Sequence, residues 1–312
     1  MSRFALSLSL IATLVLACAC SGTSAPPSTP ATAAPTVPPI TAGPAATSTP
    51  ASTAAPAVTR NVAYMPGNLT QQQLDVYVPG GDTAAFPTLL LLHGGGATKE
   101  SLSALAQHFV GLGYAVVVPN FRDTPATKYP EPVADVFCAL AWTHANAAAY
   151  RLDTQRLFAL GHSLGGTFAA LLAMIDDPVP YVQDCPATLP AGARLQAVVT
   201  FTGIFDYTAL AGATGGMQTY LHRYLGASYE QAPETWRDAS PVTYLDGAEP
   251  PFLLVHGEKD SNIDPAQSRD FAAALAASGA QVELVLVPGA DHTALLRDAA
   301  VLEKVDAFLG QP

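Results

Sequence analysis

Short runs of almost uninterrupted Val, Leu, Ala and Phe recur along the chain and alternate with longer amphipathic stretches. A strand that is buried on both faces has this composition, whereas a strand with one wet face alternates apolar and polar residues. We therefore expect buried strands at Thr88–Leu92, Tyr114–Pro119, Leu157–Leu160, Leu195–Phe201, Phe252–His256 and Val282–Val287. The stretches between them predict helices at Glu100–Gly111, Val133–Ala149, Leu164–Ile175 and Ala266–Ser278.

This alternation of strands and helices predicts the α/β class of fold. Parallel strands are joined by right-handed crossovers, usually helices that pack on the sheet. Two earlier stretches, Asn61–Met65 and Gln73–Val78, have the pattern of antiparallel edge strands. We expect a mostly parallel, eight-stranded sheet with helices on both faces and with any functional site at the carboxyl ends of the strands.

The alternation breaks down between residues 203 and 249. This segment is irregular, includes the glycine-rich stretch Gly212–Gly216 and contains scattered aromatic residues. Long connections in compact domains are usually lids or insertions, so residues 203–249 are a candidate for a small cap over a pocket. Ordinary helical packing is the alternative.

The first twenty residues are typical of a secretion signal. Arg3 precedes an apolar stretch, Phe4–Ala19, which is short for a bilayer span and ends in small residues. Its end resembles a bacterial lipobox, in which a cysteine becomes lipidated; Cys18 is the first candidate and Cys20 the second. An ordinary signal peptide with incidental cysteines is the alternative. We expect an extracytoplasmic protein, either secreted or held on the bacterial cell surface by this lipid anchor.

Residues 21–57 consist almost entirely of Ala, Thr, Ser and Pro. Such a segment buries too little apolar surface to compensate for the loss of chain entropy, so we expect a disordered, partly extended tether. Behind a lipidated cysteine, a tether would hold a folded domain away from the membrane surface. We place that folded domain at residues 58–312.

Charge and cysteine content restrict the partners of the chain. Nucleic acid is not expected, because the net charge is −11 and no cluster of Lys and Arg is present to bind phosphates. We find no metal-ligand spacing among Cys, His, Asp and Glu and expect no metal. Cys138 and Cys185 lie in the folded part, where they could form a disulfide in an oxidising compartment or remain two buried thiols.

One turn of the chain carries the pattern Gly-x-Ser-x-Gly, with Ser163 at its centre and Gly166 as an additional glycine. An expected strand ends just before this turn, and the expected helix Leu164–Ile175 follows it. A serine on a sharp strand-to-helix turn projects its hydroxyl above the sheet, and the helix N-terminus faces the charge that develops on a substrate. We therefore predict that Ser163 is a nucleophile. A glycine-rich structural turn is the alternative.

A serine hydroxyl needs a neighbouring base, which in turn needs an acid to orient it. When the serine occupies such a turn, the acid and the histidine come later in the sequence, each just after a strand. His292 follows the last expected strand, Val282–Val287, and precedes an apolar, helix-like run that begins at Thr293. We predict that His292 is the base, with a surface histidine as the alternative.

Several carboxylates could orient that base. Asp260 lies at the usual distance beyond the expected strand Phe252–His256. Asp264 follows four residues later, and Glu258 and Asp206 also lie near strand ends. We predict that Asp260 is the acid, followed by Asp264 and then Asp206.

A run of glycines, His93–Gly96, follows the expected strand Thr88–Leu92. Glycines in this position let backbone amides face a carbonyl oxygen as it becomes an oxyanion. We predict an oxyanion hole formed by the amides of Gly95, Gly96 and Leu164, with a flexible loop as the alternative. We interpret three other histidines as structural hydrogen-bonding residues, namely His93, His162 and His256.

From about Leu74 onward the chain resembles the α/β-hydrolase superfamily. The similarity is greatest to the carboxylesterase branch that includes hormone-sensitive-lipase-like and feruloyl or acetylxylan esterases. The stretches that carry the resemblance are Leu74–Pro79, His93–Gly96, Gly161–Gly166, Val255–Asp260 and Asp291–His292. One departure is Asp264, which stands where relatives often have a proline, so that a second carboxylate lies near the predicted acid.

The resemblance implies hydrolysis of a small-molecule ester through an acyl-enzyme, without a cofactor. A serine at the nucleophile position, rather than a cysteine or an aspartate, disfavours the chemistry of dienelactone hydrolases and haloalkane dehalogenases. Two rival functions remain on the same fold: a peptidase or amidase with the same residues, and a catalytically silent surface lipoprotein that binds a ligand.

Overall fold

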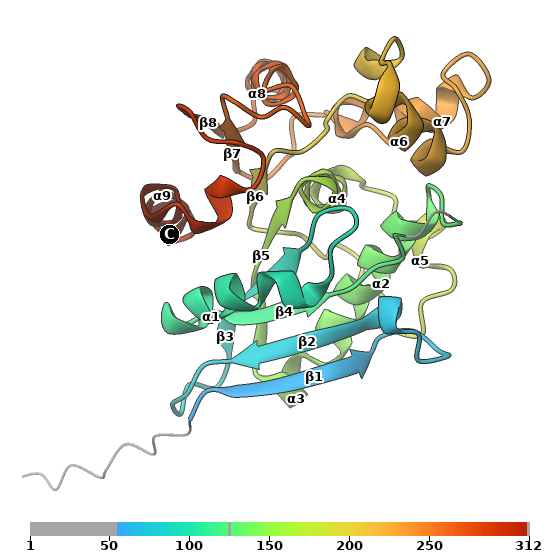
Figure 1. Ribbon diagram of the computed structural model, residues 1–312. Coiled ribbons are helices and arrows are strands. Elements are labelled where there is room, and N and C mark those ends of the chain that lie inside the picture. Colours follow the sequence, from blue (N-terminus) through green and yellow to red (C-terminus); the bar gives the residue numbers. More distant parts are fainter. Residues whose placement is uncertain (1–54, 124–125, 311–312) are drawn as a thin grey trace, which may run out of the picture. The chain divides into compact units, whose positions relative to one another are not determined.

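The computed structural model describes residues 55–123 and 126–310 (Figure 1). The signal peptide and lipidated cysteine expected in residues 1–20 lie outside this part of the chain, as does nearly all of the tether expected in residues 21–57. The first strand already begins at Ala57, the last residue assigned to the tether. Among the described residues, no helix combines the length and the hydropathy that crossing a membrane requires.

Within these residues, one sheet contains eight strands in the order β1-β2-β4-β3-β5-β6-β7-β8. The strands are β1 (Ala57–Ala63), β2 (Gln73–Val78), β3 (Phe86–Leu92), β4 (Ala115–Pro119), β5 (Leu152–His162), β6 (Ala197–Phe201), β7 (Phe252–Gly257) and β8 (Val282–Val287). β2 pairs antiparallel with both β1 and β4, and all other pairs are parallel. The predicted mostly parallel, eight-stranded sheet is confirmed.

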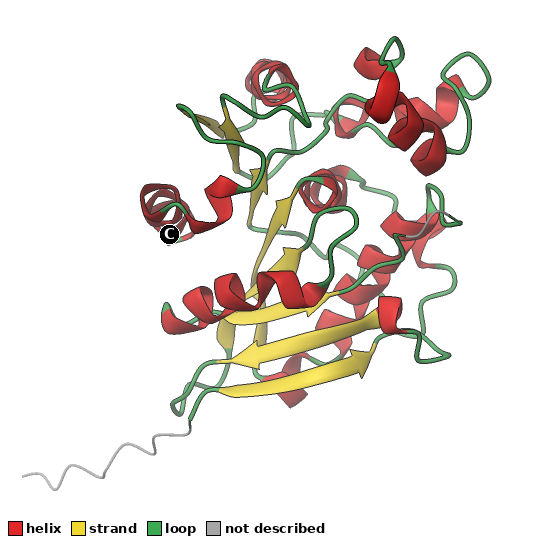
Figure 2. Ribbon diagram, in the orientation of Figure 1, coloured by secondary structure: helices red, strands yellow, loops and turns green. Residues whose placement is uncertain are grey.

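Helices cover both faces of this sheet (Figure 2). The α-helices are α1 (Ser103–Gly111), α2 (Glu131–Ala145), α3 (Ala147–Tyr150), α4 (Leu164–Met174), α5 (Val179–Val182), α6 (Gly215–Leu225), α7 (Pro233–Asp238), α8 (Ala266–Ser278) and α9 (Ala299–Leu309). The 3-10 helices are η1 (Thr70–Gln72), η2 (Lys99–Leu102), η3 (Thr208–Leu210), η4 (Pro241–Tyr244) and η5 (Ala294–Arg297).

The two faces form two hydrophobic cores because neighbouring residues of a strand point to opposite sides. In β3, Leu90 and Leu92 belong to the core that contains α2, α4 and α8, whereas Leu89 and Leu91 belong to the core that contains α1 and α9. This double burial explains why the parallel strands appear in the sequence as continuous apolar runs.

The bounds of β5 and β1 differ most from the sequence expectation, and each difference has a physical reason. β5 begins at Leu152, whereas the sequence predicted a start at Leu157. The prediction began too late because the first part of the strand is polar and mostly half-buried or exposed, and so lacks the apolar signature. β1 spans Ala57–Ala63 rather than Asn61–Met65. Asn61 has φ 57°, and the pairing of β1 with β2 shifts register between Thr59 and Val62, which interrupts the regular alternation.

A disulfide joins Cys138 on α2 to Cys185, just after α5. It answers the question that spacing left open. The bond closes a loop with a sequence separation of 47 residues. On the chain-entropy account a loop of that size stabilises the fold by about 4 kcal/mol.

Segment 203–249 consists mainly of η3, α6, α7 and η4. Leu221, Tyr224 and Leu225 of α6 are buried in the same core as α4 and α8. Three other side chains of α6 line a cavity at the carboxyl ends of the strands: Met217, Tyr220 and Arg223. The segment therefore packs as ordinary helices and also forms part of a cavity wall.

Candidate active site

Ser163 occupies the sharp turn between β5 and α4 and has φ 56° and ψ −121°. A positive φ is unfavourable for a residue with a Cβ, and it persists only where the surroundings enforce it. Here the Ser163 amide donates to the Phe201 carbonyl at 2.7 Å, and the Ser163 carbonyl accepts from the amides of Gly166 and Thr167. The turn is therefore held from the neighbouring strand β6 and from the first turn of α4.

Two glycines allow the chain to cross itself at this turn. A Cβ on Gly161 would collide with the carbonyl oxygen of Gly165, and a Cβ on Gly165 would collide with the carbonyls of Leu92 and His93. The Gly-x-Ser-x-Gly pattern thus reflects the contact of β5, the start of α4 and the end of β3. The pattern carries a steric requirement as well as a chemical one.

His292 and Asp260 come from the loops that follow β8 and β7. His292 Nδ1 lies 2.7 Å from Asp260 Oδ2, and the Asp260 side chain is fully buried. A carboxylate can only accept here, so Nδ1 carries the hydrogen and Nε2 is left as the free, basic nitrogen. His292 and Ser163 both line a cavity of about 420 Å³.

Hydrogen bonds to Asp260 keep this carboxylate ionised. Burial alone would raise its pKa, but the Ile263 amide, His292 and the Asn262 amide together hold the pKa below its usual value. An ionised carboxylate at this position favours one orientation and one tautomer of the imidazole.

The other candidate acids have different partners. Asp264 accepts a hydrogen bond from the Ala266 amide at the start of α8. Asp206 accepts from the amides of Thr208 and Ala209 at η3, and Glu258 is exposed. Among these carboxylates, only Asp260 has His292 as a partner within the described residues.

The three histidines interpreted as structural are buried. The ring of His93 stacks on Phe121 with a centroid distance of 4.0 Å. His256 lies 2.7 Å from Ser268 Oγ and 3.2 Å from Asp260 Oδ2. His162 Nε2 donates to the carbonyl of His292 at 2.8 Å, and burial lowers the pKa of His162 to about 4, so the ring is neutral near neutral pH.

The glycine loop after β3 forms one wall of the cavity, here called the glycine wall (residues 94–97). Among the described residues, the amides of Gly95 and Leu164 have no hydrogen-bond acceptor, so they remain available to an oxyanion. The Gly96 amide differs from the sequence expectation, because it donates to Asp123 Oδ2 at 2.5 Å. Of the three amides predicted for an oxyanion hole, two are therefore free.

The segment after β4 supports the glycine wall at three points. The Asn120 side chain accepts from the Lys99 amide at 2.7 Å, the Phe121 ring stacks on His93, and Asp123 binds the Gly96 amide. The loop is thereby fixed from its first residue to the start of η2.

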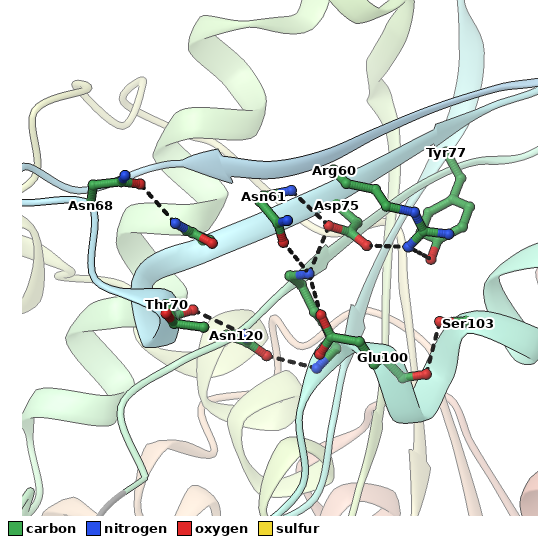
Figure 3. Close-up of polar contacts among 11 residues, drawn as sticks. Arg60, Asn61, Asn68, Thr70, Asp75, Tyr77, Glu100, Ser103 and Asn120 are labelled. Atoms are coloured by element: carbon green, nitrogen blue, oxygen red, sulfur yellow. Dashed lines mark hydrogen bonds and ion pairs between the residues drawn. The ribbon is translucent and has the colours of Figure 1, made fainter.

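A buried ionic network anchors the far end of the same loop (Figure 3). The Lys99 side chain is 1% exposed, and its Nζ lies 2.8 Å from both Asn61 Oδ1 and Asp75 Oδ1. It also lies 2.5 Å from Glu100 Oε1. Asp75 in turn binds Arg60 and the Asn61 amide, as the labelled residues of Figure 3 show.

Within this network, Lys99 and Glu100 hold each other ionised. Burial alone would lower the pKa of Lys99, but hydrogen bonds to Asp75 and Glu100 outweigh that effect and raise it. The hydrogen bond from Lys99 lowers the pKa of Glu100 to about 2. The network thus connects β1 and β2 to the residues that directly follow the glycine wall.

Sequence reasoning did not identify Lys99, Asp123 or Arg223 as parts of this region. Asp123 and Lys99 act through partners that are 27 and 24 residues away in the chain, at Gly96 and Asp75. No spacing pattern reports such contacts. A lysine just before a predicted helix is at most a weak signal. In residues 55–123 and 126–310, no group of three or more His, Cys, Asp and Glu side chains is arranged to bind a metal ion.

Comparison with curated proteins supports the family inferred from the site. The chain is 32% identical over 265 residues to esterase LipQ of Mycobacterium tuberculosis, covering 80% of this chain. The match spans 61% of the length of LipQ.

Solved structures share the fold. A bifunctional GH43-CE protein of Bacteroides eggerthii superposes with a TM-score of 0.72 at 26% identity, covering 81% of this chain and 35% of that one. A truncated carbohydrate esterase from gut microbiota superposes with a TM-score of 0.71 at 22% identity, covering 83% and 97%. Residues 74–275, more than half of the chain, match the BD-FAE family model. The chain therefore belongs to the BD-FAE family of α/β-hydrolases.

Proposed function

We propose that this protein is a serine hydrolase that cleaves a carboxylic ester of a small molecule. The observation that carries the proposal is the contact of Asp260 Oδ2 with His292 Nδ1. His292 also lines the same cavity as Ser163. The esterase name of LipQ supports the same reaction class, as does the family. A cavity of about 420 Å³ is within the usual size range of small-molecule sites.

In the proposed mechanism, Ser163 Oγ attacks the acyl carbonyl while His292 Nε2 takes its proton. The amides of Gly95 and Leu164 stabilise the oxyanion of the tetrahedral intermediate. His292 then returns the proton to the leaving alcohol, which leaves an acyl-enzyme on Ser163. Water, deprotonated by the same imidazole, hydrolyses this ester and restores the serine. Asp260 orients the imidazole throughout.

We also propose that the enzyme works outside the cytoplasm on a lipid anchor at Cys18 or, failing that, Cys20. The disulfide Cys138–Cys185 supports this location, because disulfides persist mainly in oxidising compartments. A tether over residues 21–57 would then carry the catalytic domain. Membrane fractionation of Cys18→Ser and Cys20→Ser chains tests the anchor, and unchanged membrane association in the double variant would refute it.

Replacement of Ser163 by alanine tests the reaction. We expect Ser163→Ala to lower kcat for para-nitrophenyl acetate by roughly 10⁵- to 10⁶-fold, because the nucleophile is lost while the fold is kept. A fluorophosphonate probe should label the wild-type peptide that contains Ser163 and should not label the variant. Near-normal turnover by the folded variant would refute the proposal.

The same assay distinguishes the two neighbouring carboxylates. Asp260→Asn should lower kcat by about 10⁴-fold, because the imidazole loses its partner and its tautomer. Asp264→Asn is the matched control and should retain wild-type turnover, since the asparagine side-chain oxygen can accept the same hydrogen bond from the Ala266 amide. The reverse result would make Asp264 the acid.

A further inference from the structure

Among the described residues, those that line the site include arginines but no Asp or Glu. The cavity that contains Ser163 and His292 is lined by Arg223 and by no Asp or Glu. A second cavity of about 380 Å³ shares Gly94, Ala97, His162 and Thr293 with the first, and is lined by Arg297 and again by no Asp or Glu. This is unexpected in a chain that contains 25 acidic residues and only 14 basic ones.

Most arginines of the described residues are already paired. Six of them donate to carboxylates or carbonyls, namely Arg60, Arg122, Arg151, Arg156, Arg194 and Arg237. Within residues 55–123 and 126–310, the three without a hydrogen bond or ion pair are Arg223, Arg269 and Arg297. Two of these three line the cavities at the candidate nucleophile.

Three carboxylates lie near the site in the sequence or contact residues of the site, and each of them has a partner other than Arg223 or Arg297. Asp123 accepts from the Gly96 amide, and Asp260 binds His292. Asp291 accepts from the amides of Thr293 and Ala294. None of these carboxylates lines either cavity.

Arg223 is also placed to receive a ligand. It extends from the exposed side of α6, and its guanidinium carbon lies 5.9 Å from the ring centroid of Tyr220, which lines the same cavity. An aromatic ring at this distance favours a guanidinium that lies over it. A planar guanidinium that has no hydrogen-bond or ion-pair partner among the described residues matches the geometry of a carboxylate, which it can bind through two parallel hydrogen bonds.

We propose that the substrate of this enzyme is an ester that bears a carboxylate, and that Arg223 binds this carboxylate in the cavity of Ser163. The inference rests on the proposed ester hydrolysis and specifies its substrate class. Arg223 is then a specificity-determining residue, and the net charge of −11 makes a local cation more necessary, because the protein as a whole repels anions.

Matched pairs of anionic and neutral esters test the proposal with the folded full-length chain. Mono-para-nitrophenyl adipate and its neutral methyl ester place the charge on the acyl side. Para-acetoxybenzoate and its methyl ester place it on the alcohol side. For at least one pair, wild-type kcat/KM should be higher for the anion, and that pair identifies which half of the ester lies along α6.

The variants then assign the preference to one side chain. Arg223→Gln should lower the ratio of anionic to neutral kcat/KM by roughly 2- to 5-fold, the range expected for an exposed ion pair. Arg269→Gln removes another unpaired, exposed arginine that lines neither cavity, and it should leave the ratio unchanged. Raising the salt concentration from about 0.01 M to about 1 M should also reduce the wild-type preference, because the screening length falls from about 30 to about 3 Å.

Two results would overturn the inference: no preference for the anion in either pair, or a preference that Arg223→Gln preserves. Neither result would affect the proposed reaction, which the neutral esters test separately through Ser163→Ala. If the wild-type protein hydrolyses no ester at all, the proposed function fails first.

Discussion

Two walls of the same cavity are built in opposite ways. The glycine wall, residues 94–97, continues into Lys99, whose charge is buried and paired with Asp75 and Glu100. Another wall is formed by Met217, Tyr220 and Arg223 of α6, where Arg223 has no charged partner among the described residues. On the buried side of the same helix, the Tyr224 hydroxyl has no hydrogen-bond partner among the described residues. The charge next to the glycine wall is paired, whereas the charge on the α6 wall is not.

The difference corresponds to two tasks. An oxyanion hole works only if its amides are held in place before the reaction, since their reorganisation would cost part of the stabilisation they provide. A wall that recognises one particular substrate needs polar groups that the ligand itself satisfies. We interpret the glycine wall as the fixed part of the site and α6 as the part that sets substrate preference.

Breaking the network behind the glycine wall should have the largest effect on the folded state. Lys99→Met leaves Asp75 buried with the half-exposed Arg60 as its remaining cation. Removal of one partner from a buried ion pair typically costs about 3–5 kcal/mol, and we expect the free energy of unfolding to fall by about that amount. Urea unfolding measures the loss, and kcat for a neutral ester should fall with it.

Lys304→Met provides the matched control, because Lys304 pairs with Glu283 where both side chains are 43% exposed. An exposed pair contributes at most about 1 kcal/mol. Equal losses in the two variants would show that burial of the Lys99 network does not matter, and the contrast between the walls would lose its energetic basis.

The sequence predicted the framework of the fold better than this network, and the reason is the range of the interactions. A strand buried on both faces reveals itself in a window of a few residues, as β7 and β8 did within one residue of their observed ends. The polar start of β5, Asp153–Arg156, lacked that signature, and the strand was expected five residues too late. The sequence predicted a helix-like run from Thr293, whereas α9 begins at Ala299 with Asp298 as its N-cap. The capping aspartate is a local signal that the prediction did not use.

The same distinction applies to the site. Ser163 sits in a motif whose strand, turn and helix are contiguous, so its position followed from local pattern. The contact of Asp260 with His292 joins residues that are 32 apart, and sequence could only rank Asp260 above Asp264 by its distance from a strand. The hydrogen bond from the Gly96 amide to Asp123 forms only because two loops meet in the fold. The spacing of residues along the chain does not predict that contact.

Acid should lower the stability of the folded protein through His162. This histidine lines both cavities and donates a hydrogen bond to the His292 carbonyl. Its folded pKa of about 4 lies below the value of about 6.5 in unfolded chains. The unfolded chain therefore binds more protons between these values, so stability is full above about pH 6.5 and falls as the pH drops towards 4. The full contribution is about 3 kcal/mol.

Urea unfolding at a series of pH values measures this slope. In His162→Gln the loss of stability between pH 7 and pH 4 should be smaller than in the wild type by about 3 kcal/mol, even though the variant starts from a lower value. His222→Gln, which removes an exposed histidine, is the matched control. An unchanged slope in His162→Gln would mean that this ring is not what acid destabilises.

The smallest expected effect is a difference in unfolding free energy between variants of two buried tyrosines, Tyr64 and Tyr224. The Tyr64 hydroxyl donates to the Asn120 carbonyl at 2.8 Å, within the segment that supports the glycine wall. Tyr64→Phe should therefore lower the free energy of unfolding by about 1 kcal/mol, because it leaves a buried carbonyl unsatisfied. Tyr224→Phe removes a buried hydroxyl that has no partner among the described residues, so it should leave stability unchanged or raise it by up to about 1 kcal/mol. A loss in Tyr224→Phe as large as in Tyr64→Phe would mean that the Tyr224 hydroxyl contributes a hydrogen bond to stability.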